Sequence, residues 1–395
     1  MEIDVRCNRL RSSGPRTLAW CCVSLPGDTA AERRRNRWPA RRRNRCDVVS
    51  GASTPVSRVQ PQKQPPAGTL QRRARRIALL DFWPGFYDNT DRWFTKDWFV
   101  RNLPDVEIVD ASQQPDVILF TFFGKEHQEH VRNGSSAKLV FYTGENIRPP
   151  IGKVPLCISF DHVKGVPSAL HRRLPLWVFN KEVLDVILMH EARLRGDFDS
   201  SVSKREGFCG WVASNPNMHN AKVRLQFVQT LSARYKQVAC GGEVLNNVGG
   251  PVKDKLAFIR GYRFHICFEN ATHPGYCTEK LMHGFAAGCV PIYWGDPHVS
   301  KHSKELSDFN PDALISAHDF EGPDQLIKYI ERVDSDPDLF ASYLRRPILS
   351  EAWYQCLRNY PAFCKSFADS LFQDAEKGTC PFQPARAPDR GPTAK

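Results

Sequence analysis

The stretch CFENATHPGYCTEKLMHGFAAGCVPIYWG, Cys267 to Gly295, contains most of the information that decides the fold. It joins the end of one apolar segment to a turn with Pro and Gly, a helix of small and apolar residues, and a second apolar segment. Glu269 and Asn270 end the first of these segments, a strand predicted over Tyr262–Asn270. Because parallel α/β sheets bind ligands at the carboxyl ends of their strands, the run predicts a strand, a ligand-binding turn and a helix.

Lys280 is the unusual residue of this run, because it lies in the first turn of the predicted helix. Thr278 is the predicted N-cap. The helix dipole disfavours a cation there by about 0.3–1 kcal/mol unless an anion is bound. A bound diphosphate, gripped by Lys280 and the free N–H groups, would remove this conflict, and Glu279 would suit ribose hydroxyls. An ordinary surface Glu–Lys pair is the alternative for an isolated triplet, but the small residues that follow favour the binding site.

The positive charge of the chain is concentrated in its first 76 residues. The whole chain has 55 Lys and Arg against 43 Asp and Glu, and 18 of the basic but only five of the acidic residues precede residue 77. This Arg-rich tail at 1–76 lacks apolar periodicity and is predicted to be disordered. Such an arm can bind anionic lipid or RNA, whereas an extension without a folded role is the alternative. The nearly neutral remainder opposes a nucleic-acid-binding protein.

The apolar and cysteine content predicts where the protein works. The longest apolar stretch near the N-terminus, Thr17–Leu25, stops at Pro26 and is shorter than the roughly 20 residues that a bilayer requires. A soluble or peripheral protein is therefore expected. The 13 cysteines are scattered without a CxxC pair, which favours free thiols in a reducing compartment. Pairing among Cys356, Cys364 and Cys380 is the alternative for an oxidising one.

Two successive series of short apolar runs follow the tail. The first has predicted strands at 76–83, 116–123, 138–143 and 155–160, and the second at 208–214, 235–241, 262–270, 290–295 and 313–320, with helices between them. This order predicts an α/β fold of two Rossmann-like domains that face each other across a cleft. The predicted domains are residues 77–200 and 201–350, followed by a helical segment at 351–377 and a flexible tail at 378–395.

The central run resembles the donor-binding signature of the α1,3/4-fucosyltransferases, glycosyltransferase family 10. That signature reads Phe-Glu-Asn, a short turn, Tyr-x-Thr-Glu-Lys, a helix and Val/Ile-Pro-x-x-x-Gly. FYTGEN, Phe141–Asn146, resembles the family's first-domain motif, and Trp211–Leu231 resembles the opening of its donor domain. The similarity runs from about Ile77 to Leu349 and is closest to the compact bacterial members. It implies a GT-B type fold.

The resemblance also implies a reaction and the residues that perform it. Inverting transfer of L-fucose from GDP-fucose to a GlcNAc-type or related glycan, with α1,3 linkage first, is the implied activity. Glu145 would be the general base, and the donor-binding residues would be Arg224, Asn270, Tyr276, Glu279 and Lys280. Arg224 aligns only if about three extra residues are allowed after Asn217, so Lys222 is its alternative. For Tyr276, the alternative is a core aromatic.

No metal is expected to be required, and Mn²⁺ at most stimulates. Asp197-Phe-Asp199 and the acidic run Asp334–Asp338 do not end a strand near the nucleotide motif, and the 12 histidines show no HExxH spacing. The expected partners are GDP-fucose and an oligosaccharide or glycoconjugate acceptor, without nucleic acid, and with peripheral membrane contact through the tail. The expected location is cytoplasmic or peripheral to a membrane, with the Golgi membrane as the alternative for a eukaryotic protein.

The closest competing function is another inverting GT-B glycosyltransferase that uses a different nucleotide sugar. It would share the cleft and the cationic anchor. The combination of Phe-Glu-Asn, Tyr-x-Thr-Glu-Lys and Thr-Gly-Glu-Asn favours fucose.

Overall fold

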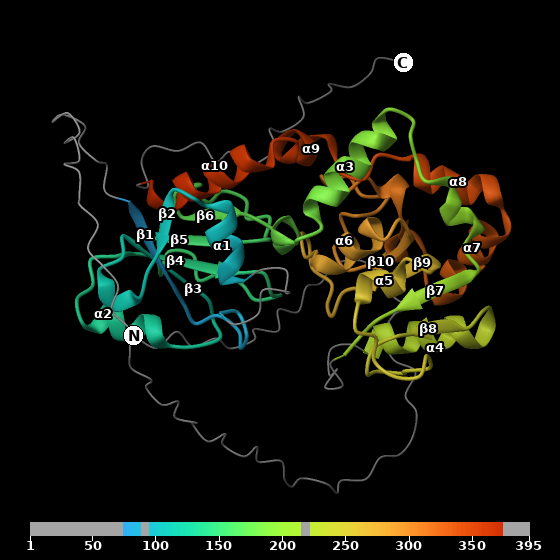
Figure 1. Ribbon diagram of the computed structural model, residues 1–395, viewed down its shortest axis with the longest axis horizontal. Helices are drawn as coiled ribbons and strands as arrows, with labels where there is room; N and C mark the ends of the chain where they lie inside the picture. Colours follow the sequence, from blue (N-terminus) through green and yellow to red (C-terminus); the bar gives the residue numbers. More distant parts are fainter. Residues whose placement is uncertain (1–73, 88–94, 215–221, 374–395) are drawn as a thin grey trace, which may run out of the picture. The chain divides into compact units, whose positions relative to one another are not determined.

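Two parallel β-sheets organise the protein, as the computed structural model shows (Figure 1). The structure describes residues 74–87, 95–214 and 222–373. The predicted C-terminal tail at 378–395 and most of the predicted N-terminal tail lie outside these residues. Both sheets have helices packed against them, which is the α/β arrangement that the sequence predicts.

The first sheet has six strands in the order β2-β1-β3-β4-β5-β6, and all of its neighbours pair in parallel. Its strands are β1 (Arg75–Leu80), β2 (Val106–Ile108), β3 (Val117–Phe120), β4 (Lys138–Thr143), β5 (Leu156–Ser159) and β6 (His171–Arg173). Helices α1 (Lys96–Asn102), α2 (Glu126–Arg132) and α3 (Val183–Leu194) belong to this half of the chain. Strands β3 and β5 are buried throughout, as expected for continuous apolar runs covered on both faces.

The second sheet has five strands in the order β11-β10-β9-β7-β8, again with parallel neighbours. Its strands are β7 (Gly207–Trp211), β8 (Val238–Cys240), β9 (Tyr262–Phe268), β10 (Val290–Trp294) and β11 (Ile315–Ser316). Its helices are α4 (Lys222–Arg234), α5 (Lys255–Ile259), α6 (Glu279–Ala286), α7 (Pro323–Ser335) and α8 (Pro337–Arg345). The central strands β9 and β10 end beside each other, where α6 begins.

Some element boundaries differ from the sequence-based expectation. The disordered tail was predicted to reach Arg76, but Arg75 and Arg76 begin β1, because their backbones pair with β2 and their charges meet Asp369 and Glu107. The strand expected over 313–320 shrinks to the two residues of β11, since short 3₁₀ turns at 311–313 and 317–319 flank it.

The last two helices of the described residues, α9 (Glu351–Leu357) and α10 (Tyr360–Phe372), return to the first sheet. The Tyr360 hydroxyl donates to the carbonyl of Val178 at 3.0 Å, and Arg172 of β6 donates to the carbonyl of Ser370. Phe367 packs edge-on against Trp98 of α1. Among the described residues, the longest helices have 13 residues, and none is long and apolar enough to cross a bilayer.

Asp308 joins the two halves through a buried network. Its carboxylate accepts two hydrogen bonds at 2.9 Å from Arg173 of β6, one at 3.0 Å from the Trp177 indole and one at 2.7 Å from the Trp353 indole of α9. Burial by itself would raise the pKa of Asp308, but the Arg173 charge and these donors outweigh it and lower the pKa. The contribution of this carboxylate to stability is therefore present above its unfolded pKa and is lost as the pH falls through its lowered folded pKa.

The described cysteines form no disulfides with one another. Eight described cysteines are single thiols, and all of them except Cys356 are buried.

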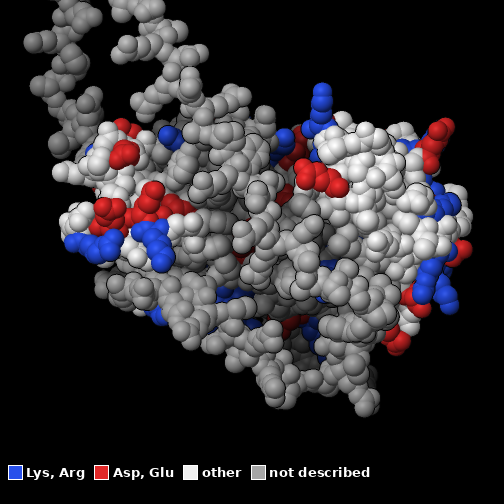
Figure 2. Space-filling model, turned by 90° about the horizontal axis from the view of Figure 1, so that it is seen from below, with Lys and Arg blue, Asp and Glu red and all other residues white. Residues whose placement is uncertain are grey.

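On the face drawn in Figure 2, acidic side chains lie among the basic ones on the described surface. A continuous basic face of the kind that binds nucleic acid is therefore not seen on this side of the described residues.

Gly284 sets how closely α6 packs on the second sheet. A Cβ at this position would lie 2.8 Å from the Cys267 sulfur of β9 and 3.3 Å from Pro291 of β10. We expect Gly284→Ala to lower the free energy of unfolding by about 1–3 kcal/mol through overpacking, measured by urea denaturation. In a Cys267→Ala background the same substitution should cost clearly less, because the sulfur is gone. An equal cost in both backgrounds would contradict the contact.

Candidate functional site

The site is built on Glu269, which directly follows β9 and is fully buried. Its backbone N–H donates to the carbonyl of Trp294 at 2.7 Å, which fixes it beside the end of β10. Its carboxylate accepts hydrogen bonds from the Thr278 N–H at 2.8 Å, from the Thr278 hydroxyl, and from Lys280 Nζ at 2.8 Å. The glutamate therefore anchors the start of α6 at the carboxyl edge of the sheet.

Thr278 is the N-cap residue of α6, but it does not cap the helix in the expected way. Its backbone is extended, and its side chain makes no capping hydrogen bond. The hydroxyl contacts Glu269 and Lys280 instead. The cap position predicted from the sequence is right, whereas the predicted capping interaction is wrong, because the hydroxyl donates to Glu269 and accepts from the Lys280 ammonium group instead of from a helix N–H.

Lys280 projects between two carboxylates. Its Nζ lies 2.8 Å from Glu269 Oε2 and 3.3 Å from Glu279 Oε1, and its side chain is 22% exposed. Burial alone would lower the pKa of Lys280, but the two carboxylates raise it above its usual value. The unfavourable helix dipole is thus already offset by the protein itself, so the cation at this position does not by itself require a bound anion.

Glu279 faces two cations, one of which the sequence analysis missed. Burial would raise its pKa, but the charges of Lys280 and Lys255 lower it to about 2. Lys255 is the first residue of α5 and is only partly exposed. The run KDKLAF just before β9 is the only sequence signal for this residue, and it gives no reason to choose Lys255 over its neighbours.

Of the two candidates on α4, the structure places Arg224 at the site. Arg224 is partly buried, and its charge interacts with those of Glu269 and Glu279. Burial lowers the pKa of its guanidinium group. Lys222 is exposed. Residues 215–221, which contain the predicted extra residues after Asn217, lie outside the described part of the chain.

Tyr276 is a buried aromatic residue, as one of the two interpretations of the sequence has it, and its hydroxyl reaches the turn after β9. Its ring is buried, with 1% exposed, and packs at 5.0 Å from the Phe160 ring. Its hydroxyl donates to Asn270 Oδ1 at 2.7 Å, which places both residues at the turn that follows β9. Burial and the nearby carboxylates raise the pKa of Tyr276, so the phenol stays protonated and serves as a donor.

Glu145 approaches this cluster from the first sheet. It follows β4 and is partly buried, and its backbone N–H donates to the Thr143 hydroxyl at 3.1 Å. Burial raises its pKa above the ordinary glutamate value, and Glu279 adds to the shift while the Lys280 charge opposes it. A small pocket beside Glu145 is lined by aromatic side chains that include Trp83, Phe122 and Phe123.

The two acidic runs considered in the sequence have structural partners. Asp199 accepts a hydrogen bond from the Ser201 N–H, and Asp336 caps α8 by accepting from two backbone N–H groups. Asp334 pairs with Arg263 at 2.6 Å.

A cavity of about 510 Å³ lies away from the Lys280 cluster, at the opposite, C-terminal end of α6, where Ala286, Ala287 and Gly288 line it.

Comparison with known proteins identifies the family. Residues 77–180 match the model of the alpha-(1,3)-fucosyltransferase FucT N-terminal domain, and residues 202–368 match that of the glycosyltransferase family 10 (fucosyltransferase) C-terminal part. The chain belongs to glycosyltransferase family 10. Within this family, Glu145 lies in the part matched by the first model, and the whole Lys280 cluster lies in the part matched by the second.

Relatives of known function and solved structures agree with this membership. An alpha-(1,3)-fucosyltransferase of Helicobacter pylori is 32% identical over 68% of this chain and 59% of its own length. A human 4-galactosyl-N-acetylglucosaminide 3-alpha-L-fucosyltransferase is 31% identical over 42% of this chain and 44% of its own. The chain thus spans less than two thirds of these curated relatives.

The fold likeness extends over most of the length of two solved fucosyltransferases. A crystal structure of an α1,3-fucosyltransferase superposes with a TM-score of 0.57 at 26% identity, covering 76% of this chain and 92% of that one. A crystal structure of an α1,3-fucosyltransferase with GDP-fucose superposes with a TM-score of 0.55 at 25% identity, covering 76% and 90%. The predicted GT-B type fold of two Rossmann-like domains is confirmed.

Proposed function

We propose that this family 10 protein transfers L-fucose from GDP-fucose to a hydroxyl of a GlcNAc-type glycan, with inversion and α1,3 linkage. The observation that carries the proposal is the grouping of Lys280, Arg224 and Lys255 around one helix start, within electrostatic reach of Glu145 on the other sheet. One side of the site thus offers cations for a leaving group, and the other offers a base.

The reaction follows from this division. The acceptor oxygen attacks the anomeric carbon of fucose, the bond from that carbon to the phosphate oxygen breaks, and GDP leaves with the bonding electrons. The acceptor proton goes to Glu145, and the negative charge that develops on the diphosphate is met by Lys280 and Arg224. Attack on the face opposite the departing GDP gives inversion. No step in this sequence requires a metal.

The diphosphate of the donor is proposed to bind cations that already form ion pairs with carboxylates of the protein. Lys280 is bound to Glu269 and Glu279 in this structure, so a diphosphate must offer more charge than one of these carboxylates. Glu279, which keeps its charge at neutral pH, is then placed to accept hydrogen bonds from ribose hydroxyls. Asn270 and Tyr276 are proposed to contact the fucosyl-diphosphate region. The solved relative that was crystallised with GDP-fucose supports this donor.

The exposed aromatic side chains beside Glu145 support a sugar acceptor, although the pocket between them is itself small, with a volume of about 10 Å³. Phe123 is 44% exposed and stacks on Phe122 with ring centroids 4.2 Å apart, and Trp83 meets Phe123 edge-on at 6.0 Å. Exposed aromatic faces of this kind provide an apolar platform next to polar groups, as small-molecule sites require. The name of the human relative supports an N-acetylglucosaminide as the acceptor class.

Calorimetric titration of the full-length chain with GDP, GDP-fucose and UDP tests the donor assignment. We expect GDP and GDP-fucose to bind and UDP to bind at least tenfold more weakly. Glu279→Gln should weaken GDP about 10- to 100-fold, because a hydrogen bond to a charged group is worth about 1.5–3 kcal/mol. Glu129→Gln on the exposed face of α2 is the matched control and should leave binding unchanged. Equal affinity for UDP would instead favour a transferase of another nucleotide sugar.

A further inference from the structure

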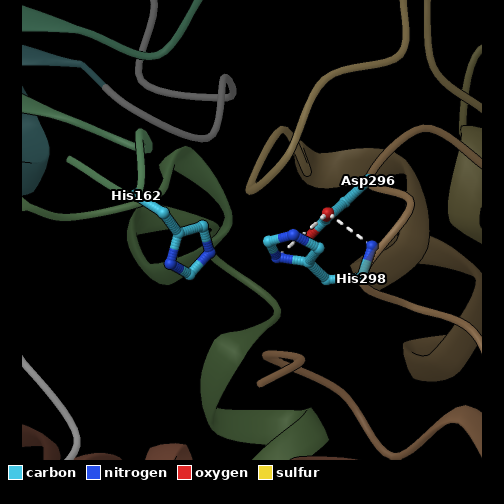
Figure 3. A group of neighbouring side chains, drawn as sticks. All are labelled: His162, Asp296 and His298. Atoms are coloured by element: carbon cyan, nitrogen blue, oxygen red, sulfur yellow. Dashed lines mark hydrogen bonds and ion pairs between the residues drawn. The ribbon is translucent and has the colours of Figure 1, made fainter. Parts of the chain in front are cut away.

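His162, Asp296 and His298 form a group that the proposed reaction does not use (Figure 3). One ligand-type atom from each residue lies within 4.8 Å of those of the other two. His162 follows β5 of the first sheet, whereas Asp296 and His298 follow β10 of the second. The two histidine rings lie side by side, with centroids 4.9 Å apart and planes tilted by 58°. The fold therefore brings three metal-ligating side chains together from two sheets.

Asp296 is the residue that points to a missing ligand. It is fully buried, and its Oδ1 accepts a hydrogen bond from the His298 backbone N–H at 2.9 Å. Its Oδ2 is also buried and has no hydrogen-bond donor in good geometry among the described residues, although the Gly275 backbone interacts with this carboxylate. His298 Nδ1, which lies 3.9 Å from Asp296 Oδ1, likewise has no hydrogen-bond partner in the described part of the chain. Buried polar atoms are normally paired, so two unpaired atoms side by side indicate a ligand position.

We propose that these three residues bind a divalent transition-metal ion, with Zn²⁺ as the best match. Two imidazole nitrogens and one carboxylate oxygen form a donor set typical of zinc and of other borderline metals. Ligand atoms in a tetrahedral zinc site lie about 3.4 Å apart, given metal–ligand distances of about 2.0–2.1 Å. The group must therefore close by up to about 1.4 Å from its 4.8 Å spacing, which rotation of the exposed His162 side chain can provide.

The surrounding charges are compatible with a cation. Two basic side chains, Arg173 and Lys164, interact electrostatically with His162. The Arg173 guanidinium is neutralised by the two 2.9 Å hydrogen bonds to Asp308, and Lys164 is 81% exposed, so solvent screens its charge. Asp296 adds a further negative charge that no described cation pairs at short range. The site is separate from Lys280 and its carboxylates, so it rests on different residues from the proposed transfer reaction.

Metal binding here would act on the turn that follows β9. Gly275 lies against the His162 segment so closely that a Cβ would be 2.5 Å from the Phe160 carbonyl oxygen and 2.9 Å from the His162 ring. The next residue is Tyr276. A metal ion that fixes His162 to Asp296 and His298 would therefore clamp the turn between the two sheets, and bound metal should raise the thermal midpoint.

The test uses Zn²⁺ and Co²⁺ with the full-length chain after removal of metals by a chelator. Calorimetry should show one Zn²⁺ per chain at this site, and Asp296→Asn and the double variant His162→Ala/His298→Ala should each weaken it at least tenfold. His302→Ala, an exposed histidine outside the group, is the matched control and should not change the affinity. Zn²⁺ should raise the thermal midpoint of the wild type and of the control, but not of the double variant.

Three results would overturn the proposal. The first is no Zn²⁺ binding to a folded wild-type chain. The second is unchanged binding in the double variant. The third is a Co²⁺ spectrum dominated by thiolate-to-metal charge transfer, which would assign the metal to cysteines. GDP titration of the same variants separates this site from the donor site, because metal binding does not depend on the transferase assignment.

Discussion

Lys280→Ala is expected to lower kcat/KM for GDP-fucose by at least about a hundredfold. The ammonium group is the cation closest to the start of α6, and removing one charge-stabilising donor from a partly dry site costs about 10²–10³ in rate. The loss should also appear as weaker GDP binding in the calorimeter. Steady-state transfer rates and GDP titrations on the same preparation measure both effects.

The same substitution has a structural cost that must be separated from the catalytic one. Lys280 is the partner of the buried Glu269, so its removal leaves that carboxylate with the Thr278 donors and the charge of Arg224. Lys236→Ala provides the control, because Lys236 also pairs with a buried carboxylate, that of Asp334, at 2.7 Å. It should lower the thermal midpoint but leave kcat/KM within about threefold of wild type. A folded Lys280→Ala protein with wild-type turnover would refute the role of the lysine.

Glu145→Gln is expected to reduce kcat by about 10²–10⁴ while GDP affinity stays within a few-fold. The amide keeps the shape of the side chain but cannot take the acceptor proton. Because Glu145 belongs to the first sheet and the donor anchors belong to the second, loss of the base should leave the donor site intact. Glu129→Gln on α2 is the matched control. Equal losses in GDP affinity and in kcat would show that Glu145 acts in donor binding instead.

The pH dependence of activity provides an independent test of Glu145 as the general base. Burial raises the pKa of Glu145, and a base must be ionised to work, so activity should fall as the pH drops through this raised value. The acid limb should therefore lie above the ordinary glutamate range and disappear in Glu145→Gln. Since the Lys280 charge lowers the pKa of Glu145, the limb that remains in Lys280→Ala should move to higher pH. A limb that does not move would contradict their electrostatic contact.

The sequence predicts a strand correctly where the buried strand is an uninterrupted run of apolar residues. β4 matches its predicted limits, and β10 differs by one residue, because each is an uninterrupted apolar segment. β6 has the sequence His-Arg-Arg and was missed. All three of its residues are buried, and the two arginines donate to Ser370 and Asp308, more than 130 positions further along the chain. No local pattern carries that information.

The sequence likewise predicts some residues of the candidate site and misses others. Glu279, Lys280 and Asn270 belong to one continuous motif, so their grouping follows from the sequence. The counter-charge that Glu269 supplies to Lys280 was not foreseen, because it depends on how the end of β9 meets the start of α6. Lys255 was missed for the same reason, since only the tertiary fold brings α5 next to Glu279.

The return of α9 and α10 to the first sheet limits how this protein can be recombined with its relatives. A chimera designed to change acceptor choice would naturally exchange residues 77–180, the segment matched by the N-terminal family model. That graft would separate Arg173 and Trp177 from Asp308 and Trp353, and Arg172 from the backbone of α10. A crossover that respects these pairings must carry residues 351–372 with the graft and match the position of Asp308. The unit of exchange in this chain is therefore discontinuous, and its two ends belong to the same half of the fold.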